Sequence, residues 1–163
     1  MTPCYVHPLT VPFYDVDPMG VVWHGNYVKY FEEARCGLLR SIGTNYAALT
    51  DEDILLPVVS LEIKYMRPCL FGQELAIEVS ADQDNVNFLV LHYLVRDQAT
   101  GERLCKATTR QAAVDNATKK LLFEIPASLR ERLADRIFQT MNGENAINTV
   151  GPDRRAGRLP ASP

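Results

Sequence analysis

The densest group of residues that could carry out chemistry lies between positions 13 and 27, where the chain reads Phe-Tyr-Asp-Val-Asp-Pro-Met-Gly-Val-Val-Trp-His-Gly-Asn-Tyr. Asp17 stands directly before the Pro-Met-Gly turn, and a side chain of this type is ionised at neutral pH. An ionised carboxylate can attack a carbonyl carbon directly or remove a proton from an attacking water. Asp17 is therefore the candidate nucleophile or general base.

Carbonyl chemistry also needs a group that stabilises negative charge on oxygen, and a helix predicted to begin near His24 supplies one. The first N–H groups of a helix have no partner within it and lie at the positive end of its dipole, so they suit an oxyanion site. A loop containing Gly20 separates Asp17 from this helix and lets both converge on one small group. His24 is thus a second candidate catalytic residue. The candidate substrate-binding residues surround the helix start: Trp23, Gly25, Asn26 and Tyr27.

Each of these residues also has a purely structural interpretation. An Asp before a Pro commonly forms a turn, so Asp17 could serve only that purpose. His24 could simply bond to the backbone at the helix start. Asp15 is interpreted as a structural residue that ends a strand or caps the loop. Tyr27 is predicted to lie in the core, where it could also line a substrate pocket, and His92 is predicted to be a core or interface histidine.

The element that must position these residues is a helix predicted from Asn26 to about Gly43, with Asn26 as its N-cap. Apolar side chains recur at steps of three and four residues, as on one face of an amphipathic helix: Tyr27, Tyr30, Phe31, Ala34, Leu38 and Ile42. The polar side chains of the same segment fall on the other face: Lys29, Glu32, Glu33 and Arg40.

Strands are predicted before and after this helix. Residues 9–16 read as a first strand, with Pro12 suited to an edge position. After the helix, alternating or continuous apolar runs predict four consecutive antiparallel strands with short turns, at about 59–65, 74–80, 86–95 and 103–114. A second, shorter helix is predicted at 127–138, after Pro126.

One long helix followed by consecutive strands favours an α+β fold in which a five-stranded antiparallel sheet wraps around the helix. Such a sheet has open edges, and association of two copies would cover one of them, so we expect a homodimer or homotetramer. Residues 1–141 are predicted to form this domain. Residues 142–163 have no apolar periodicity, so we predict a poorly ordered tail whose deletion leaves folding and turnover nearly unchanged.

Composition and spacing argue against several other classes. The 163 residues carry a net charge of −3 without a long basic run, so nucleic acid is not an expected partner. No stretch approaches the roughly 20 apolar residues that span a bilayer, and the start of the chain lacks the regions of a signal peptide. We therefore expect a cytoplasmic protein without stable membrane insertion. The four cysteines and three histidines fall in no metal-ligand spacing, so we expect free thiols and no metal site.

The pattern Asp-x-Asp-Pro-x-Gly-Val-Val-x-His-x-Asn-Tyr, followed by Phe31-Glu-Glu-Ala-Arg35, resembles the 4-hydroxybenzoyl-CoA thioesterase branch of the hot-dog superfamily. Within that branch it is most similar to the short-chain and Tol–Pal-associated acyl-CoA thioesterases. The resemblance implies a hot-dog fold, active sites at a dimer interface and hydrolysis of an acyl-CoA without metal or organic cofactor. It matches Asp17 to the family's catalytic aspartate and His24 to a position at the helix N-terminus.

Other functions remain open at this point. A hot-dog hydratase or dehydratase shares the scaffold but needs a differently placed His/Asp or His/Glu set. A thioesterase acting on an acyl-carrier protein, or a non-catalytic acyl-CoA or acyl-carrier binding partner, would carry the same fold. A serine hydrolase is excluded because the chain has no G-x-S-x-G motif. Lys64, Arg67 and Arg96 are interpreted as solvated strand residues rather than as contacts to CoA phosphates.

Overall fold

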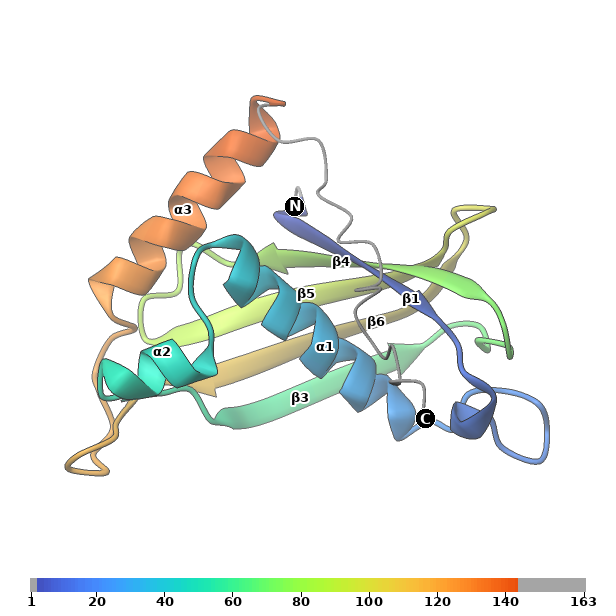
Figure 1. The fold of residues 1–163 in the computed structure, drawn as a ribbon, viewed down its shortest axis with the longest axis horizontal. Helices are drawn as coiled ribbons and strands as arrows, with labels where there is room; N and C mark the ends of the chain where they lie inside the picture. Colours follow the sequence, from blue (N-terminus) through green and yellow to red (C-terminus); the bar gives the residue numbers. More distant parts are fainter. Residues whose placement is uncertain (1–2, 144–163) are drawn as a thin grey trace, which may run out of the picture.

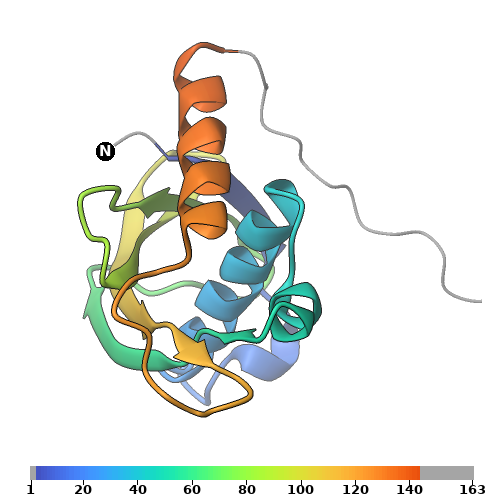
Figure 2. The same ribbon diagram turned by 90° about the vertical axis from the view of Figure 1, so that its left-hand side faces the viewer.

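The computed structural model describes residues 3–143 and shows a curved five-stranded antiparallel sheet with one long helix in its concave side (Figures 1 and 2). In spatial order the strands are β1 (Tyr5–Thr10), β4 (Glu74–Ala81), β5 (Phe88–Asp97), β6 (Arg103–Ala112) and β3 (Val58–Tyr65). The long helix is α1 (Asn26–Ser41), and α3 (Ala127–Met141) follows the sheet. The predicted hot-dog fold is therefore confirmed.

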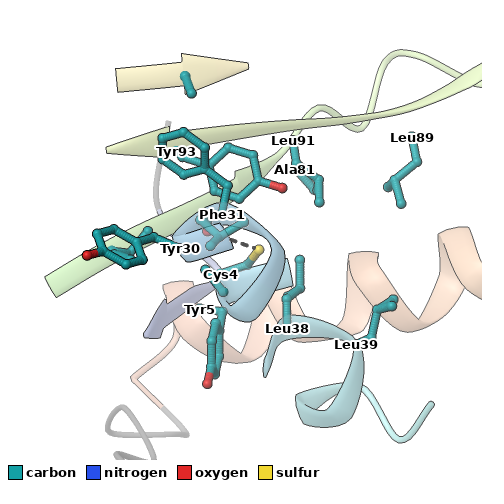
Figure 3. Packing of buried hydrophobic residues seen from close by; sticks show 14 of the residues in the cluster. Cys4, Tyr5, Tyr30, Phe31, Leu38, Leu39, Ala81, Leu89, Leu91 and Tyr93 are labelled. Carbon is teal, nitrogen blue, oxygen red and sulfur yellow. Dashed lines mark hydrogen bonds between the residues drawn. The ribbon is translucent and has the colours of Figure 1, made fainter. Parts of the chain in front are cut away.

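The core forms between α1 and the concave face of the sheet. The apolar face of α1 is buried as its periodicity predicted, and Phe31 packs on Tyr93 of β5 with 4.9 Å between ring centroids (Figure 3). Strands β4 and β5 contribute every second side chain to this core, and Leu75, Ile77 and Val79 of β4 are completely buried. The helix lies close to β1 because Gly37 has no side chain, and a Cβ there would stand 2.4 Å from the hydroxyl oxygen of Tyr5.

Two local predictions were wrong at the start of the domain. The first strand covers Tyr5–Thr10 instead of 9–16, and Phe13–Asp15 form a short 3₁₀ turn. Pro12 is therefore not a strand residue. It precedes the 3₁₀ turn, at a point where the chain has already left the sheet. Asn26 is not the N-cap of α1, because Gly25 occupies that position without a side-chain hydrogen bond.

The predicted run of four neighbouring strands holds only for its last three members. Strand β3 does not pair with β4 but pairs antiparallel with β6 at the far edge of the sheet, with Ser60 opposite Arg110 and Tyr65 opposite Cys105. The segment 66–73 leads the chain from β3 at one edge to β4 on the other side of β5 and β6 (Figure 1). As a result β1 and β3 are the two edge strands, and the side chains of β3 are largely exposed.

Smaller elements complete the described chain. They are α2 (Tyr46–Asp51) and a two-stranded ribbon of β2 (Ile54–Leu55) and β7 (Val114–Asp115), none of which the sequence pattern predicted. Among residues 3–143, no helix is both long and apolar enough to cross a membrane. The predicted tail at 142–163 lies outside the described residues apart from its first two positions.

Candidate active site

The chain between β1 and α1 forms a small hairpin that is fixed to the segment before β4. Val16 and Val22 face each other in an antiparallel bridge, and Val21 forms another with Leu70. The amide of Val22 donates to the carbonyl oxygen of Cys69 at 2.9 Å. Asp17 lies at the turn of this hairpin, so its position depends on backbone bonds to a distant part of the sequence.

The turn itself is organised around Asp17. The Asp17 amide donates to the carbonyl of Val21 at 2.8 Å, and the Gly20 amide donates to the carbonyl of Asp17 at 2.9 Å. The Oδ1 atom of Asp17 accepts the amide of Met19 at 2.8 Å. Gly20 has a φ of +77°, a left-handed conformation that glycine adopts without strain. One carboxylate oxygen is therefore used in the turn, while Asp17 remains half-exposed.

Asp15 is the residue that joins this loop to the helix. Its side chain is only 4% exposed, and its two oxygens accept hydrogen bonds from Lys29 Nζ at 2.5 Å and from the Tyr30 hydroxyl at 2.9 Å. Its carbonyl oxygen accepts the Trp23 amide at 3.0 Å and the Asn26 side chain at 2.9 Å. Burial, and secondly the hydrogen bond to Asp15, raise the pKa of Tyr30, which keeps the phenol protonated as a donor. The structural interpretation of Asp15 thus rests on four contacts.

The start of α1 is shaped by four of the candidate residues. The rings of Trp23 and His24 lie 4.8 Å apart, and the Trp23 ring covers Gly25, where a Cβ would stand 2.0 Å from a ring carbon. The Asn26 amide donates to the carbonyl of Trp23 at 2.9 Å. Only glycine at position 25 lets the indole lie against the backbone of the helix start.

Several amide groups at this helix start point to no acceptor. Within residues 3–143, the backbone N–H groups of His24, Gly25 and Tyr27 donate to no other group of the chain, whereas those of Asn26 and Val28 do. Free N–H groups at a helix N-terminus, together with the helix dipole, attract negative charge. This arrangement can accept a carbonyl oxygen on which charge develops.

A shallow hollow of about 310 Å³ lies beside the helix start, between the hairpin and the end of β3. Tyr27 forms its inner wall, with its ring edge-on to that of Tyr65 at 5.1 Å and its hydroxyl accepting the Cys69 amide at 3.2 Å. The Tyr65 hydroxyl donates to the carbonyl of His24 at 2.8 Å. Burial is the main cause that raises the pKa of Tyr27. The walls are otherwise formed by Val21, Val22, His24, Met66, Arg67 and Pro68.

The structure therefore brings some predicted site residues together and leaves others apart. His24 and Tyr27 line the hollow, while Asp17 sits in the adjoining turn and is not one of its walls. No hydrogen bond joins Asp17 to His24 in the described chain. Tyr65 was missed from the sequence, where it appears only as one apolar member of an alternating strand. Its exposure at 46% marks it as unusual for a strand aromatic.

Other hollows are found away from this hairpin, including the two that follow. One of about 250 Å³ lies between α3 and the β4–β5 turn, lined by apolar residues such as Phe88 and Leu133 and by charged ones such as Asp82 and Arg130. Another of about 470 Å³ lies on the convex face of the sheet. Although both are better enclosed than the hollow beside Tyr27, neither contains a residue of the 13–27 motif. Chemistry rather than enclosure therefore favours the site at the helix start.

Comparison with known proteins points to one family. A family model described as the thioesterase-like superfamily matches residues 11–133. The protein sll0410 of Synechocystis sp., whose name gives esterase as a provisional assignment, is 35% identical over 70% of this chain and 69% of its own length. The acyl-CoA thioesterase YbgC of Haemophilus influenzae is 30% identical over 66% of this chain and 79% of its own length.

Solved structures show the same fold. The gentisyl-coenzyme A thioesterase BH1999 superposes with a TM-score of 0.67 at 26% identity, covering 79% of this chain and 98% of its own. Slr0204, a 1,4-dihydroxy-2-naphthoyl-CoA thioesterase from Synechocystis, gives a TM-score of 0.74 at 20% identity over 80% of this chain and 96% of its own. At 20% identity, the similarity to Slr0204 concerns the fold alone.

Proposed function

Because the chain belongs to the thioesterase-like superfamily, we propose that it hydrolyses acyl-CoA thioesters to a free carboxylic acid and CoA. The observation that carries this proposal is the hairpin that leads from Asp17, at its turn, into a helix start whose first N–H groups have no acceptor within residues 3–143. A carboxylate and an oxyanion site are the two parts that thioester hydrolysis needs. Several relatives are named as CoA thioesterases or hydrolases, which supports the same substrate class.

In the proposed reaction the thioester carbonyl oxygen lies against the N–H groups of His24, Gly25 and Tyr27. The free oxygen of Asp17 attacks the carbonyl carbon, or removes a proton from a water that attacks it. Collapse of the tetrahedral intermediate breaks the carbon–sulfur bond and releases the CoA thiolate, which takes up a proton. In the first case water then hydrolyses the acyl-aspartyl anhydride. Neither route requires a metal or an organic cofactor.

His24 is proposed to orient the substrate or the water rather than to start the reaction, because its ring lines the hollow without bonding to Asp17. His24→Ala should lower kcat by about 10²-fold, near the lower end of the range for one acid–base or positioning group. The measurement is steady-state hydrolysis of the best acyl-CoA. Complete loss of turnover in a folded His24→Ala protein would make the imidazole a primary catalyst and require a different mechanism.

A second copy of the chain is proposed to complete the site. Strand β3 is an open edge, and three of its apolar side chains are exposed: Val58 at 44%, Val59 at 55% and Leu61 at 38%. The hollow beside Tyr65 lies at the end of this edge and is widely open. Pairing of β3 with its counterpart across a two-fold axis would cover these residues and deepen the hollow.

We therefore expect active protein to be a homodimer or a homotetramer built from dimers. Light scattering at micromolar concentration should return at least twice the 18.3 kDa mass of the chain. Val59→Lys places a charge on the exposed edge and should shift the protein toward monomer with loss of activity, whereas Thr10→Lys, at an exposed position of β1 on the opposite edge of the sheet, should change neither. A fully active monomer would contradict the shared site.

Product analysis separates this function from its alternatives. The purified protein is incubated with saturated and 2-enoyl acyl-CoA esters and with acyl-carrier-protein thioesters, and the products are identified by mass. A hydrolase releases free thiol and acid, a hydratase adds water to the enoyl group, and a binding protein leaves all esters intact. We expect release of CoA. Hydration, or unchanged esters that bind tightly, would overturn the proposal.

The branch of the superfamily, the acyl group of the substrate and the cellular location are part of the proposal as well. The motif at 13–35 is most similar to the 4-hydroxybenzoyl-CoA branch and its Tol–Pal-associated members, so we propose an aromatic or short-chain acyl group as the substrate. An acyl-carrier protein is the second candidate donor. A cytoplasmic location is proposed because CoA esters are made and used there, and cell fractionation would test it.

A further inference from the structure

The convex face of the sheet, opposite α1, carries the largest of the hollows described above, at about 470 Å³. Side chains from β3, β4, β5 and β6 surround it. The strand register places them in cross-strand rows.

Two of the directly opposed pairs in this hollow consist of like charges. Lys64 of β3 is opposite Lys106 of β6, and Arg96 of β5 is opposite Arg103 of β6. Like charges that face each other across neighbouring strands destabilise a sheet. Because the two pairs adjoin each other on β6, four cationic groups converge on one area of the surface.

The acidic side chains of the hollow do not neutralise this cluster. Its walls contain four basic residues and two acidic ones, Glu62 and Glu78, which leaves an excess of two positive charges. Glu78 is already bound to Arg96 Nε at 2.7 Å. Within residues 3–143, Lys64, Lys106 and Arg103 take part in no ion pair.

The floor beside these cations is polar. His92 of β5 and Thr108 of β6 are opposite each other, and the His92 Nδ1 atom lies 3.1 Å from the Thr108 hydroxyl. Ser80 of β4 is opposite His92 on the other side. A row of hydroxyl and imidazole groups next to unpaired ammonium and guanidinium groups is suited to the oxygens of a phosphate.

We propose that this hollow is a binding site for the phosphate groups of a small phosphorylated molecule. Lys64, Lys106 and Arg103 bind the phosphate oxygens, and the polar floor accepts and donates further hydrogen bonds. The ligand would offset the repulsion within both like-charge pairs. Two sources supply this chemistry: the nucleotide end of a CoA ester, or a separate nucleotide. The site is inferred from the convex face alone and does not depend on the proposed hydrolysis.

Calorimetric titration with CoA, ADP and inorganic phosphate at low salt tests the site. The double variant Lys64→Gln/Lys106→Gln should weaken binding of the phosphorylated compound at least roughly tenfold. The matched control Lys119→Gln/Lys120→Gln removes two neighbouring charges from the turn after β7, at the other end of β6, and should bind as the wild type does. Binding by CoA alone identifies the substrate end, and binding by ADP as well identifies a nucleotide site.

Thermal stability gives an independent readout. Without ligand at low salt, Lys64→Gln/Lys106→Gln should unfold at a higher temperature than the wild type, because a like-charge pair is removed, and it should gain less stability from added ligand. The proposal is overturned if the wild type binds none of the three compounds, or if the double variant binds them as tightly as the wild type does.

Discussion

Asp17→Asn should fold normally, bind acyl-CoA and turn it over at least roughly 10³-fold more slowly than the wild type. Folding should survive because the Asn side chain retains an Oδ1 atom that accepts the Met19 amide, the bond that Asp17 makes in the turn at 2.8 Å. Chemistry should fail because the amide has no negative charge with which to attack or to remove a proton. The loss should appear in kcat with little change in substrate affinity, since the interaction is made in the transition state.

A second variant distinguishes the role of Asp17 in the turn from the role of its negative charge. Asp17→Ala removes both the acceptor for Met19 and the carboxylate, so it should lose activity to the same extent and some stability in addition. Trapping of an acyl group on Asp17 in the wild type would identify nucleophilic attack. Equal turnover in the wild type and Asp17→Asn would mean that Asp17 only forms a turn, and the base would have to be sought at Asp15, His24 or Glu33.

The next largest effect is expected at Asp15. Asp15→Ala should lower the free energy of unfolding by about 2–4 kcal/mol, because it leaves the buried Tyr30 hydroxyl without an acceptor and the Lys29 ammonium without a counter-charge. Denaturant unfolding followed by circular dichroism measures this change. Activity should fall too, since Asp15 joins the hairpin that carries Asp17 to α1.

An exposed aspartate provides the control for this measurement. Asp84, in the turn between β4 and β5, is exposed, and Asp84→Ala should change the free energy of unfolding by no more than about 0.5 kcal/mol. An Asp15→Ala protein as stable as the wild type would show that the contacts of Asp15 to Lys29 and Tyr30 contribute nothing net, and that other contacts hold the hairpin in place.

The sequence predicted best the elements in which apolar residues recur at a regular spacing. The helix at Asn26–Ser41 and the strands β4, β5 and β6 follow directly from apolar spacing. The pairing of β3 with β6 could not be predicted in this way, because it depends on contacts between residues forty or more positions apart, such as Ser60 and Arg110. The short helix α2 was missed since six residues carry too little periodicity.

In the candidate site, too, features that depend on local sequence were predicted, and features that depend on contacts in the folded chain were not. Asp17 and the helix start were predicted from a contiguous motif, whereas the burial of Asp15 was not, since a charged residue is normally exposed. Its partner Lys29 lies on the helix face that the periodicity assigned to solvent, and it is indeed 53% exposed. Only the folded chain shows that this exposed ammonium reaches back to a carboxylate in the preceding loop.

The central claim is that Asp17 carries out thioester cleavage beside the N-terminus of α1. Single-turnover release of free CoA, with protein in excess over the best acyl-CoA, measures that step apart from product release. We predict that the wild type releases one equivalent of thiol per bound ester, and that Asp17→Asn, bound to the same ester, releases it at least roughly 10³-fold more slowly. Equal rate constants in the two proteins, or no release by the wild type from any acyl-CoA that it binds, would contradict the claim.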